Sequence, residues 1–332
     1  MAQMKYFYEL TISSSPHAHS PVTTQTIMRD VLIALIPAML GSIYFFGFRS
    51  LLVTLVSAAA CVFFEWGFCK VRKLHCKTYD LSAVVTGVLL AFVCPVTIPY
   101  WTIILGDFFA IVLVKMLFGG LGKNIVNPAL AGRAFLFSWP VLMSNWVKVG
   151  FDNAAGLLST ADAVTAATPM SAMHQGALPE ESIIDMFLGN IGGCIGETSA
   201  LLLIIGFVYL LYRKVITARI PLAYIGTVAI LAFLFPQGND RIAWMAAQVF
   251  GGGLMLGAIF MATDYVTSPL TKLGQIVYGI GCGIITILIR YFGGYSEGVT
   301  YAILCMNACS VLLDKIGRPV KFGAPKKEAA KK

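Results

Sequence analysis

The sequence predicts an all-α polytopic membrane protein with about ten transmembrane helices. Of its 332 residues, 58% are hydrophobic and 12% are charged, and the mean hydropathy is +0.80. These values lie far from those of a soluble globular chain. The apolar residues also gather in runs of about 20, the length that an α-helix needs to cross the hydrocarbon core of a bilayer.

The basic residues occupy short loops and the C-terminal tail. The net charge of +8 alone would suit a nucleic-acid-binding protein, but basic residues placed between apolar runs follow the positive-inside rule of membrane proteins. We therefore expect membrane lipid around the chain and no nucleic acid partner. The polar segment before Ile27 has no short apolar region followed by a small-residue cleavage site, so we expect no secretory signal peptide.

The apolar segments fall into two groups of five. Residues 1–26 form the expected cytoplasmic N-terminal segment, and residues 27–144 hold the first group. The second group, in residues 183–314, opens with a stretch that glycines and Glu197 interrupt, which predicts a broken or re-entrant helix. The expected spans are residues 30–48, 51–69, 81–94, 100–118, 124–144, 183–212, 220–236, 242–262, 273–291 and 298–314.

Charge clusters set the expected orientation of these spans. The loop from Lys70 to Lys77 and the tail of residues 315–332 are dense in Lys and Arg, so both should face the cytoplasm. With ten spans, both termini are then cytoplasmic. The segment of residues 145–182 is expected on the extracytoplasmic side.

The two groups of spans also resemble each other. When Gly87 is placed on Gly257, Pro99 falls on Pro269, and in each half an apolar span follows that ends at Phe-Gly-Gly. Because the aligned spans would run in opposite directions, the halves would be inverted repeats, whose sites usually form where Gly and Pro break helices near the repeat interface. A chance match between glycine-rich membrane helices is the alternative.

Eight cysteines are present, with no C-x-x-C spacing, and most of them lie in apolar runs. Such cysteines usually serve as small buried hydrophobic residues, and two thiols alone do not make a metal site. We therefore predict no metal centre in this chain.

Ionisable side chains within or beside apolar spans are costly, and each is a functional candidate. Lys115 and Arg290 lie near span ends, where a long side chain can instead extend toward water. The full set is Glu65, Asp107, Lys115, Arg133, Asp185, Glu197, Asp264 and Arg290.

Two polar, glycine-rich groups precede apolar helices. Residues 119–133 carry Asn124, Asn127 and Arg133, and amides at a helix N-terminus suit the carbonyls and ring nitrogens of a flavin or an anion. Tight helix packing explains the glycines of this group equally well. Residues 189–199 end in Glu197-Thr198-Ser199, whose hydroxyls are expected on the same side of the membrane as residues 145–182.

A third polar group follows the expected span of residues 242–262. It contains Thr263, Asp264, Thr267 and Ser268 and is expected on the cytoplasmic side. Asp264 is more typical of a structural hydrogen-bond hub than of a proton donor.

The stretch of residues 162–169 reads Asp-Ala-Val-Thr-Ala-Ala-Thr-Pro. Small residues leave room around Thr168, and Pro169 should end any helix that would hide its hydroxyl, so we expect that hydroxyl to be exposed. An ordinary Ser/Thr loop is the alternative. The stretch resembles the D-x-x-[ST]-G-A-T signal on which a flavin transferase esterifies the last threonine to FMN, with Ala166 in place of the usual glycine.

Five segments together resemble the D subunit of the Rnf ferredoxin:NAD oxidoreductases, in order and spacing, over essentially the whole chain. They are SPHAHS, FGGLGKNIVNPALAGRAF, DAVTAATP, GNIGGCIGETS and MATDYVTSP. The B subunit of the sodium-pumping NADH:quinone oxidoreductases forms a related family. The resemblance implies ten spans in two inverted five-span repeats, similar to urea transporters, in the bacterial cytoplasmic membrane.

The resemblance also implies two flavins. FMN would be joined through a phosphoester to Thr168, and riboflavin would bind noncovalently deeper in the bundle. The side chains that we expect to contact these flavins are Arg133, Glu197, Thr198 and Ser199, together with Asn124, Asn127, Thr263, Asp264, Thr267 and Ser268.

The implied function is electron relay. The chain would pass electrons across the membrane, without a catalytic acid or base of its own, in a complex that couples ferredoxin oxidation and NAD reduction to Na⁺ or H⁺ transport. Its partners would be the A, B, C, E and G subunits of the Rnf complex, above all the G subunit with its covalent FMN, and a flavin transferase would mature it. The alternatives are a solute channel or transporter, a scaffold for redox partners, and the quinone-reducing sister protein.

Overall fold

Helices make up the regular structure of both halves of the chain. The computed structural model describes residues 22–73, 78–143, 145–147, 168–179, 181–197, 199–238, 240–295 and 297–316. Within these ranges every element is helical, as the composition predicts.

Two long helices open the first half. α1 (Thr24–Phe46) begins at a capping box in which the side chains of Thr23 and Thr26 each accept from the other's backbone N–H. Gly47, at φ 79°, then lets the chain turn directly into α2 (Phe48–Val71). Shorter helices complete this half: η1 (Thr78–Asp80), α3 (Ser82–Phe92), α4 (Tyr100–Phe108), its π-helical continuation η2 (Phe109–Met116), α5 (Pro128–Leu136) and α6 (Pro140–Met143).

The second half has one long helix, α13, among shorter ones. Side chains at helix starts explain several boundaries: Asp240 accepts from backbone N–H groups of α11, and Thr271 accepts from one of α13. The elements are α7 (Pro169–His174), α8 (Ile183–Leu188), α9 (Ala200–Tyr212), α10 (Arg219–Leu234), α11 (Arg241–Phe250), α12 (Leu254–Leu256), the π-helical η4 (Gly257–Met261), α13 (Lys272–Phe292) and α14 (Val299–Leu313).

Only some of these helices could span a bilayer alone. By length and composition, α1, α2 and α13 are each long and apolar enough to cross a membrane. α11 together with α12–η4 forms a fourth candidate, which is bent by 59°. The apolar helices α3, α9, α10 and α14 are shorter. The ten-span topology therefore stays a prediction.

Three expected spans are not continuous helices. The break predicted within residues 183–212 is confirmed, because α8 ends at Leu188 and α9 begins only at Ala200. The continuous helix expected over 242–262 is wrong: the chain bends between α11 and α12, where Gly252 adopts a φ of 64°. The helix expected over 124–144 is also wrong, because Asn127 caps α5 and the helix ends at Leu136.

In each half, one helix packs against two helices that follow it. α2 packs against α3 and α4, and α10 packs against α11 and α13. Gly87 lies in α3 and Gly257 at the start of η4, so the aligned glycines both fall in helices. The inverted symmetry itself stays a prediction.

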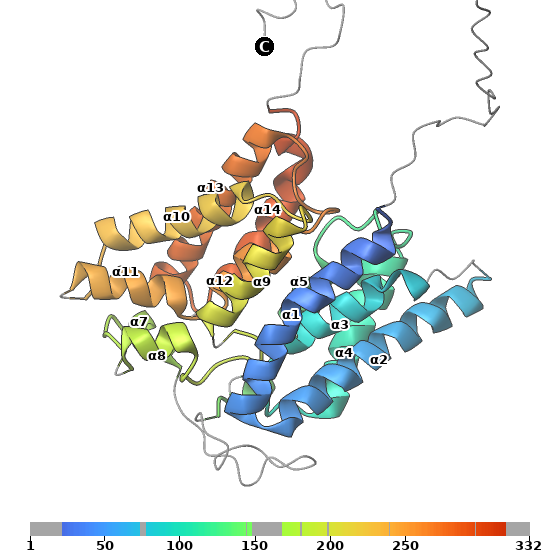
Figure 1. The fold of residues 1–332 in the computed structure, drawn as a ribbon, viewed down its shortest axis with the longest axis horizontal. Helices are drawn as coiled ribbons and strands as arrows, with labels where there is room; N and C mark the ends of the chain where they lie inside the picture. Colours follow the sequence, from blue (N-terminus) through green and yellow to red (C-terminus); the bar gives the residue numbers. More distant parts are fainter. Residues whose placement is uncertain are drawn as a thin grey trace, which may run out of the picture.

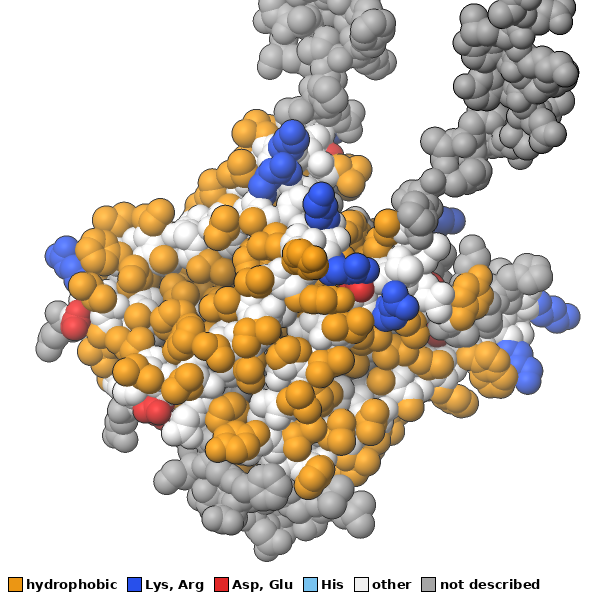
Figure 2. Space-filling model, viewed as in Figure 1, with side chains coloured by type: hydrophobic (Ala, Val, Ile, Leu, Met, Phe, Trp, Pro, Cys, Tyr) orange, Lys and Arg blue, Asp and Glu red, His pale blue; other side chains and the backbone are white. Residues whose placement is uncertain are grey.

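The ends of the bundle differ. α1 begins and α14 ends in the upper part of Figure 1, whereas α7 and α8 lie in its lower part. On the face shown in Figure 2, hydrophobic side chains cover a broad band, and several of the visible Lys and Arg side chains lie above it. This distribution is typical of a helical bundle that presents apolar side chains to lipid and a basic end to one compartment.

Candidate functional site

A buried arginine on α5 lies at the centre of the site. Arg133 is 1% exposed, with Nη1 3.1 Å from Glu197 Oε1 and Nη2 2.6 Å from Glu297 Oε2. The same nitrogens donate to Thr300 Oγ1 (3.1 Å) and Cys194 Sγ (3.4 Å). Because Arg133 belongs to the first half and all four partners belong to the second, this cluster joins the halves.

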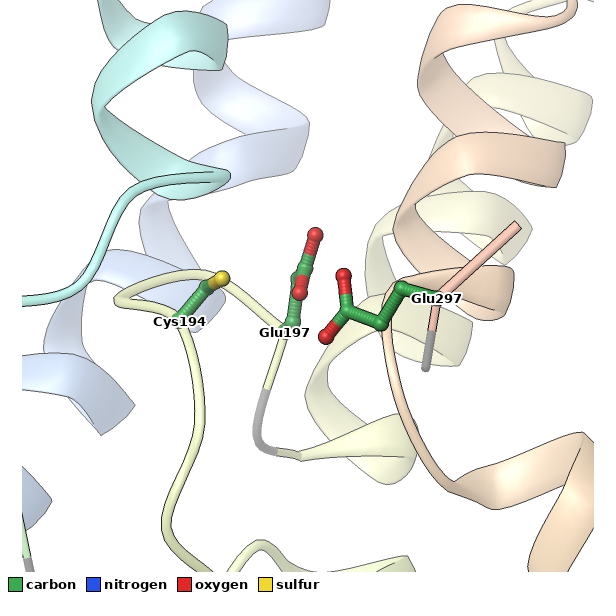
Figure 3. A group of neighbouring side chains, drawn as sticks. All are labelled: Cys194, Glu197 and Glu297. Carbon is green, nitrogen blue, oxygen red and sulfur yellow. The ribbon is translucent and has the colours of Figure 1, made fainter. Parts of the chain in front are cut away.

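The partners of Arg133 converge from two segments. Cys194 and Glu197 lie between α8 and α9, Glu297 directly precedes α14, and Figure 3 shows the three side chains gathered around one point. Their potential ligand atoms lie within 4.8 Å of one another, close enough to hold a metal ion. The Arg133 guanidinium already contacts all three, however, and would repel a second cation. We interpret the group as an ion-pair cluster, and the absence of a metal centre stays a prediction.

Thr168 borders a small cavity beside this cluster. The residue is the N-cap of α7, and Pro169 takes the first helical position, where its missing N–H costs nothing. Thr168 is 6% exposed, so the expectation of an exposed hydroxyl is wrong: Pro169 starts a helix rather than ending one, and Thr168 is buried at that start. The cavity, called the Thr168 cavity below, is lined by Thr168, Pro169, Met170, Ile191, Gly192, Gly193, Glu197, Gly252 and Glu297.

The residues predicted around FMN fall into three cases. Glu197 lines the Thr168 cavity. Ser199 is buried, but its hydroxyl accepts from the backbone N–H of Leu202 and so caps α9. Thr198, like residues 162–167 of the threonine motif, lies outside the described residues.

Positive and negative charges balance near the Thr168 cavity. Arg290, on α13, is 2% exposed, and its Nη2 donates to the carbonyl oxygen of Gly251 at the α11–α12 bend. The guanidinium groups of Arg133 and Arg290 and the carboxylates of Glu197 and Glu297 therefore supply two positive charges and two negative ones. The formal charge of this group of four is thus zero.

A second cavity collects the remaining predicted polar residues. Asn124, Asn127, Thr263 and Asp264 all line it, although the first pair precedes α5 and the second pair follows η4. Asn127 joins the two segments directly, since its Nδ2 donates to the carbonyl oxygen of Met261 at 3.3 Å while its Oδ1 caps α5. The structure therefore brings four residues from two halves into one place, called the Asn124 cavity below.

The other two residues of the third group support this cavity. Thr267 Oγ1 donates to Asp264 Oδ2 at 3.1 Å, and the Ser268 N–H donates to the Asp264 carbonyl oxygen at 3.1 Å. Asp264 is thus a hydrogen-bond hub, as expected. Neither Thr267 nor Ser268 is among the described residues that line the cavity.

The Asn124 cavity has apolar walls and polar edges. Ile27 and Val31 of α1, with Val85 and Leu89 of α3, provide part of the apolar wall. The Asn124 Oδ1 is buried without a hydrogen-bond partner among the described residues, so one acceptor is free for a ligand that donates an N–H. Such a combination is typical of a site for a planar, largely apolar ring with a polar edge.

The two cavities lie toward opposite ends of the bundle. Ile27, in the first turn of α1, lines the Asn124 cavity, whereas α7 and α8 lie near the other end of α1 (Figure 1). Arg133 belongs to the cluster beside the Thr168 cavity rather than to the Asn124 cavity, although it follows Asn127 by less than two helical turns.

Sequence reasoning missed one residue of these sites and misjudged another. Glu297 was not singled out because it lies in a loop, yet an acid in a short loop on the expected Thr168 side was an available signal. Lys115 was interpreted as a span-end residue, but it is 1% exposed and lines the Asn124 cavity. Its Nζ lies 2.9 Å from Glu65 Oε1, and no feature of the sequence pairs these two residues.

Comparison with known proteins gives one consistent family. The family model described as NQR2, RnfD, RnfE matches residues 11–323. The chain is 45% identical to the D subunit of the Na(+)-translocating ferredoxin:NAD(+) oxidoreductase complex of Acetobacterium woodii, over 96% of each chain. It is 44% identical to the D subunit of the proton-translocating ferredoxin:NAD(+) oxidoreductase complex of Clostridium ljungdahlii, over 94% of this chain and 96% of that one.

A more distant relative carries a similar name. The chain is 34% identical to the D subunit of the ion-translocating oxidoreductase complex of Actinobacillus succinogenes, over 93% of this chain and 96% of that one. The motifs of the two cavities therefore sit in a sequence that matches D subunits along nearly its whole length. The chain belongs to the NQR2, RnfD, RnfE family, as a member that resembles the D subunit of the Rnf complex.

Proposed function

We propose that this chain is the membrane flavoprotein subunit of an ion-translocating ferredoxin:NAD oxidoreductase complex. It relays electrons across the membrane between an FMN esterified to Thr168 and a noncovalent riboflavin in the Asn124 cavity. The observation that carries this proposal is the pair of cavities toward opposite ends of one bundle, each lined by residues of two of the motifs that resemble the D-subunit family.

The Thr168 cavity suits an attachment site. Its walls include Gly192, Gly193 and Gly252, whose lack of side chains leaves backbone groups open to a ring or a phosphate. A phosphate diester adds one negative charge, and the balanced set of two arginines and two glutamates nearby presents no net negative charge to repel it. FMN is larger than this small cavity, so its ring would extend beyond the residues that line it.

The Asn124 cavity suits a neutral, noncovalent flavin. The free Oδ1 of Asn124 can accept an N–H, the side chains of Asn127 and Thr263 can orient the polar edge, and the apolar wall excludes water. A bound flavin supplies one- or two-electron redox chemistry, and the protein sets its position, potential and access to water. No side chain of this chain has to act as a catalytic acid or base in such a relay.

The complexes to which the relatives belong indicate which ion and which partner subunits to propose for this chain. The first two relatives described above differ in the ion that their names give, Na⁺ in one and the proton in the other, and the chain is nearly equally similar to both. We propose that either Na⁺ or H⁺ transport is coupled to the relay. The partners are the A, B, C, E and G subunits of the complex, of which the G subunit exchanges electrons with the Thr168 end, and a flavin transferase.

The proposed placement is a bacterial cytoplasmic membrane with both termini inside. α1 begins and α14 ends at one end of the bundle, and α7 lies at the other (Figure 1). The basic loop of Lys70, Arg72 and Lys73 supports a cytoplasmic position for the first end. The Thr168 cavity then faces the extracytoplasmic side.

The attachment is tested by replacing Thr168 with valine, which keeps the shape and removes the hydroxyl. The complex is produced together with its flavin transferase and separated on a denaturing gel, where we expect flavin fluorescence from the wild-type chain and none from Thr168→Val. Ser171→Ala, which removes another hydroxyl three residues away, should keep full fluorescence. Peptide mass should place FMN on Thr168.

Flavin content also separates the alternatives. A wild-type chain that carries no covalent flavin beside its transferase would contradict the proposal and favour a solute channel or transporter. A complex that reduces quinone with NADH, but not NAD with reduced ferredoxin, would favour the quinone-reducing sister. A chain with no flavin of either kind, in a complex that still transfers electrons, would be a scaffold.

A further inference from the structure

Helix α2 carries a buried polar stripe that the electron relay does not use. Ser57, Cys61 and Glu65 follow one another at four-residue spacing and so lie on one face of the helix. Their exposed fractions are 0%, 0% and 6%. This face meets α3 and the continuous α4–η2 helix, which contributes Asp107 and Lys115 to the same interface.

Asp107 is a carboxyl group buried without a cation paired to it among the described residues. It is 0% exposed, and its Oδ1 lies 2.7 Å from Ser57 Oγ and 3.2 Å from Cys61 Sγ. Its Oδ2 is buried with no hydrogen-bond partner among the described residues. An isolated carboxylate in such a place is costly, whereas a carboxylic acid is not.

The charged groups around Asp107 are committed elsewhere. On η2, the Lys115 Nζ pairs with Glu65 Oε1 at 2.9 Å and donates to Ser82 Oγ at 2.7 Å. On α5, Arg133 is engaged by Glu197 and Glu297, as described above. The titratable thiols near Asp107 are Cys61 on α2 and Cys94 after α3, while α3 itself carries no titratable side chain.

The single hydrogen that the Ser57 hydroxyl can donate indicates whether the Asp107 carboxyl group is protonated in this geometry. Ser57 Oγ lies 2.9 Å from the Gly87 carbonyl oxygen and 2.7 Å from Asp107 Oδ1, but a hydroxyl has only one hydrogen to donate. Both contacts are full two-centre hydrogen bonds if Asp107 carries a proton and donates it to Ser57, which then donates to Gly87. A single Ser57 hydrogen shared between the two oxygens would leave both bonds weaker. If Asp107 loses its proton, the Ser57 hydroxyl can rotate toward the carboxylate without moving a heavy atom.

We propose that Asp107 is a proton-binding site within the membrane, which holds a proton in this geometry and exchanges it as an electron enters and leaves the Asn124 cavity. The inference rests on the proposed electron relay, because the electron supplies the charge that the proton balances. Uptake forms one O–H bond on Asp107 and release breaks it, so no oxidant or reductant is needed beyond the relay.

The position of Asp107 suits this role. Ser82, Thr86 and Lys115 line the Asn124 cavity, while the carbonyl of Gly87 on the same helix α3 faces Ser57. One helix therefore separates the electron site from the proton site. On the other side, Glu65 lines a cavity with Asp80, Gly119 and Gly120, and its Oε2 has no partner among the described residues, so this end of the stripe offers a route for the proton.

The test is infrared spectroscopy of the whole complex in proteoliposomes, in two stages. Spectra of the complex kept under reducing conditions, in H₂O and D₂O, should show a carboxylic-acid C=O band that shifts with deuterium and is lost in Asp107→Asn. The difference between reduced and oxidised complex should show that this band is weaker in the oxidised complex. Asp30→Asn is the matched control, because Asp30 is also buried but is paired with Arg213, and it should leave the band unchanged.

The outcomes separate this inference from the proposed function. A complex without flavin gives no redox difference spectrum, and that failure belongs to the electron relay, while the H₂O/D₂O stage still tests the protonation of Asp107. In a flavin-loaded complex, two results overturn the inference. One is a carboxylic-acid band that persists in Asp107→Asn. The other is a wild-type band of equal intensity in the oxidised and reduced states. If Asp107→Asn does not assemble, Ser57→Ala decides: the band must shift because the acid loses its acceptor, and an unshifted band overturns the inference.

Discussion

Replacing Arg133 by leucine is expected to destabilise the protein more than loss of any surface ion pair. The substitution leaves the buried carboxylate of Glu197 and the largely buried carboxylate of Glu297 close together without their counter-ion. Breaking a buried pair in this way costs about 3–5 kcal/mol, mostly because the remaining charge is uncompensated. The midpoint of thermal unfolding of the detergent-solubilised complex should fall, and in-gel flavin fluorescence should fall with the amount of folded chain.

Two further variants show whether buried charge causes this loss. Arg213→Leu removes an arginine whose side chain is 46% exposed. Its partner Asp30 is buried but keeps a hydrogen bond from the Tyr209 hydroxyl, so the loss of stability should be smaller than for Arg133→Leu. Arg133→Leu combined with Glu197→Gln and Glu297→Gln removes the stranded charges and should recover much of the midpoint. Equal midpoints for Arg133→Leu and Arg213→Leu would show that the cluster does not hold the halves together.

Much of the helical architecture could be predicted where sequence signals are local. The expected spans of residues 51–69 and 273–291 correspond closely to α2 (Phe48–Val71) and α13 (Lys272–Phe292), because long apolar runs determine both. The span of residues 242–262 was less predictable. Its length suited one helix, but Gly251, Gly252 and Gly253 allow the backbone to bend, and only the tertiary packing decides that it does.

The two sites were predictable to different degrees. Asn124, Asn127, Thr263 and Asp264 were recognised as unusual polar residues, and the internal repeat suggested that such groups approach one another. The role of Glu297 was not predictable, since it depends on how the start of α14 packs against α5. The burial of Thr168 also depends on tertiary contacts, because a threonine before a proline can equally end a loop or cap a helix.

Filling the Asn124 cavity is expected to remove one flavin and leave the other. Val85, on α3, lines this cavity, and a phenylalanine there would occupy the space of a planar ring. We expect Val85→Phe to lose the flavin that acid precipitation releases and to keep the flavin that stays attached to the chain. Ferredoxin-dependent NAD reduction by the complex should then fall at least about tenfold, because an electron path interrupted between its two ends cannot operate.

The neighbouring residue provides a control on the same helix. Val84 lines a different cavity, formed with Leu55, Ala58 and Trp66 on the α2 side, so Val84→Phe makes the same change on the other face of α3. It should keep both flavins and the activity of the complex. If Val85→Phe retained the releasable flavin, the second flavin would lie outside the Asn124 cavity, and the unpartnered Asn124 Oδ1 would need another explanation. If Val84→Phe and Val85→Phe both lost the releasable flavin, the effect would come from disturbed packing of α3 rather than from a blocked site.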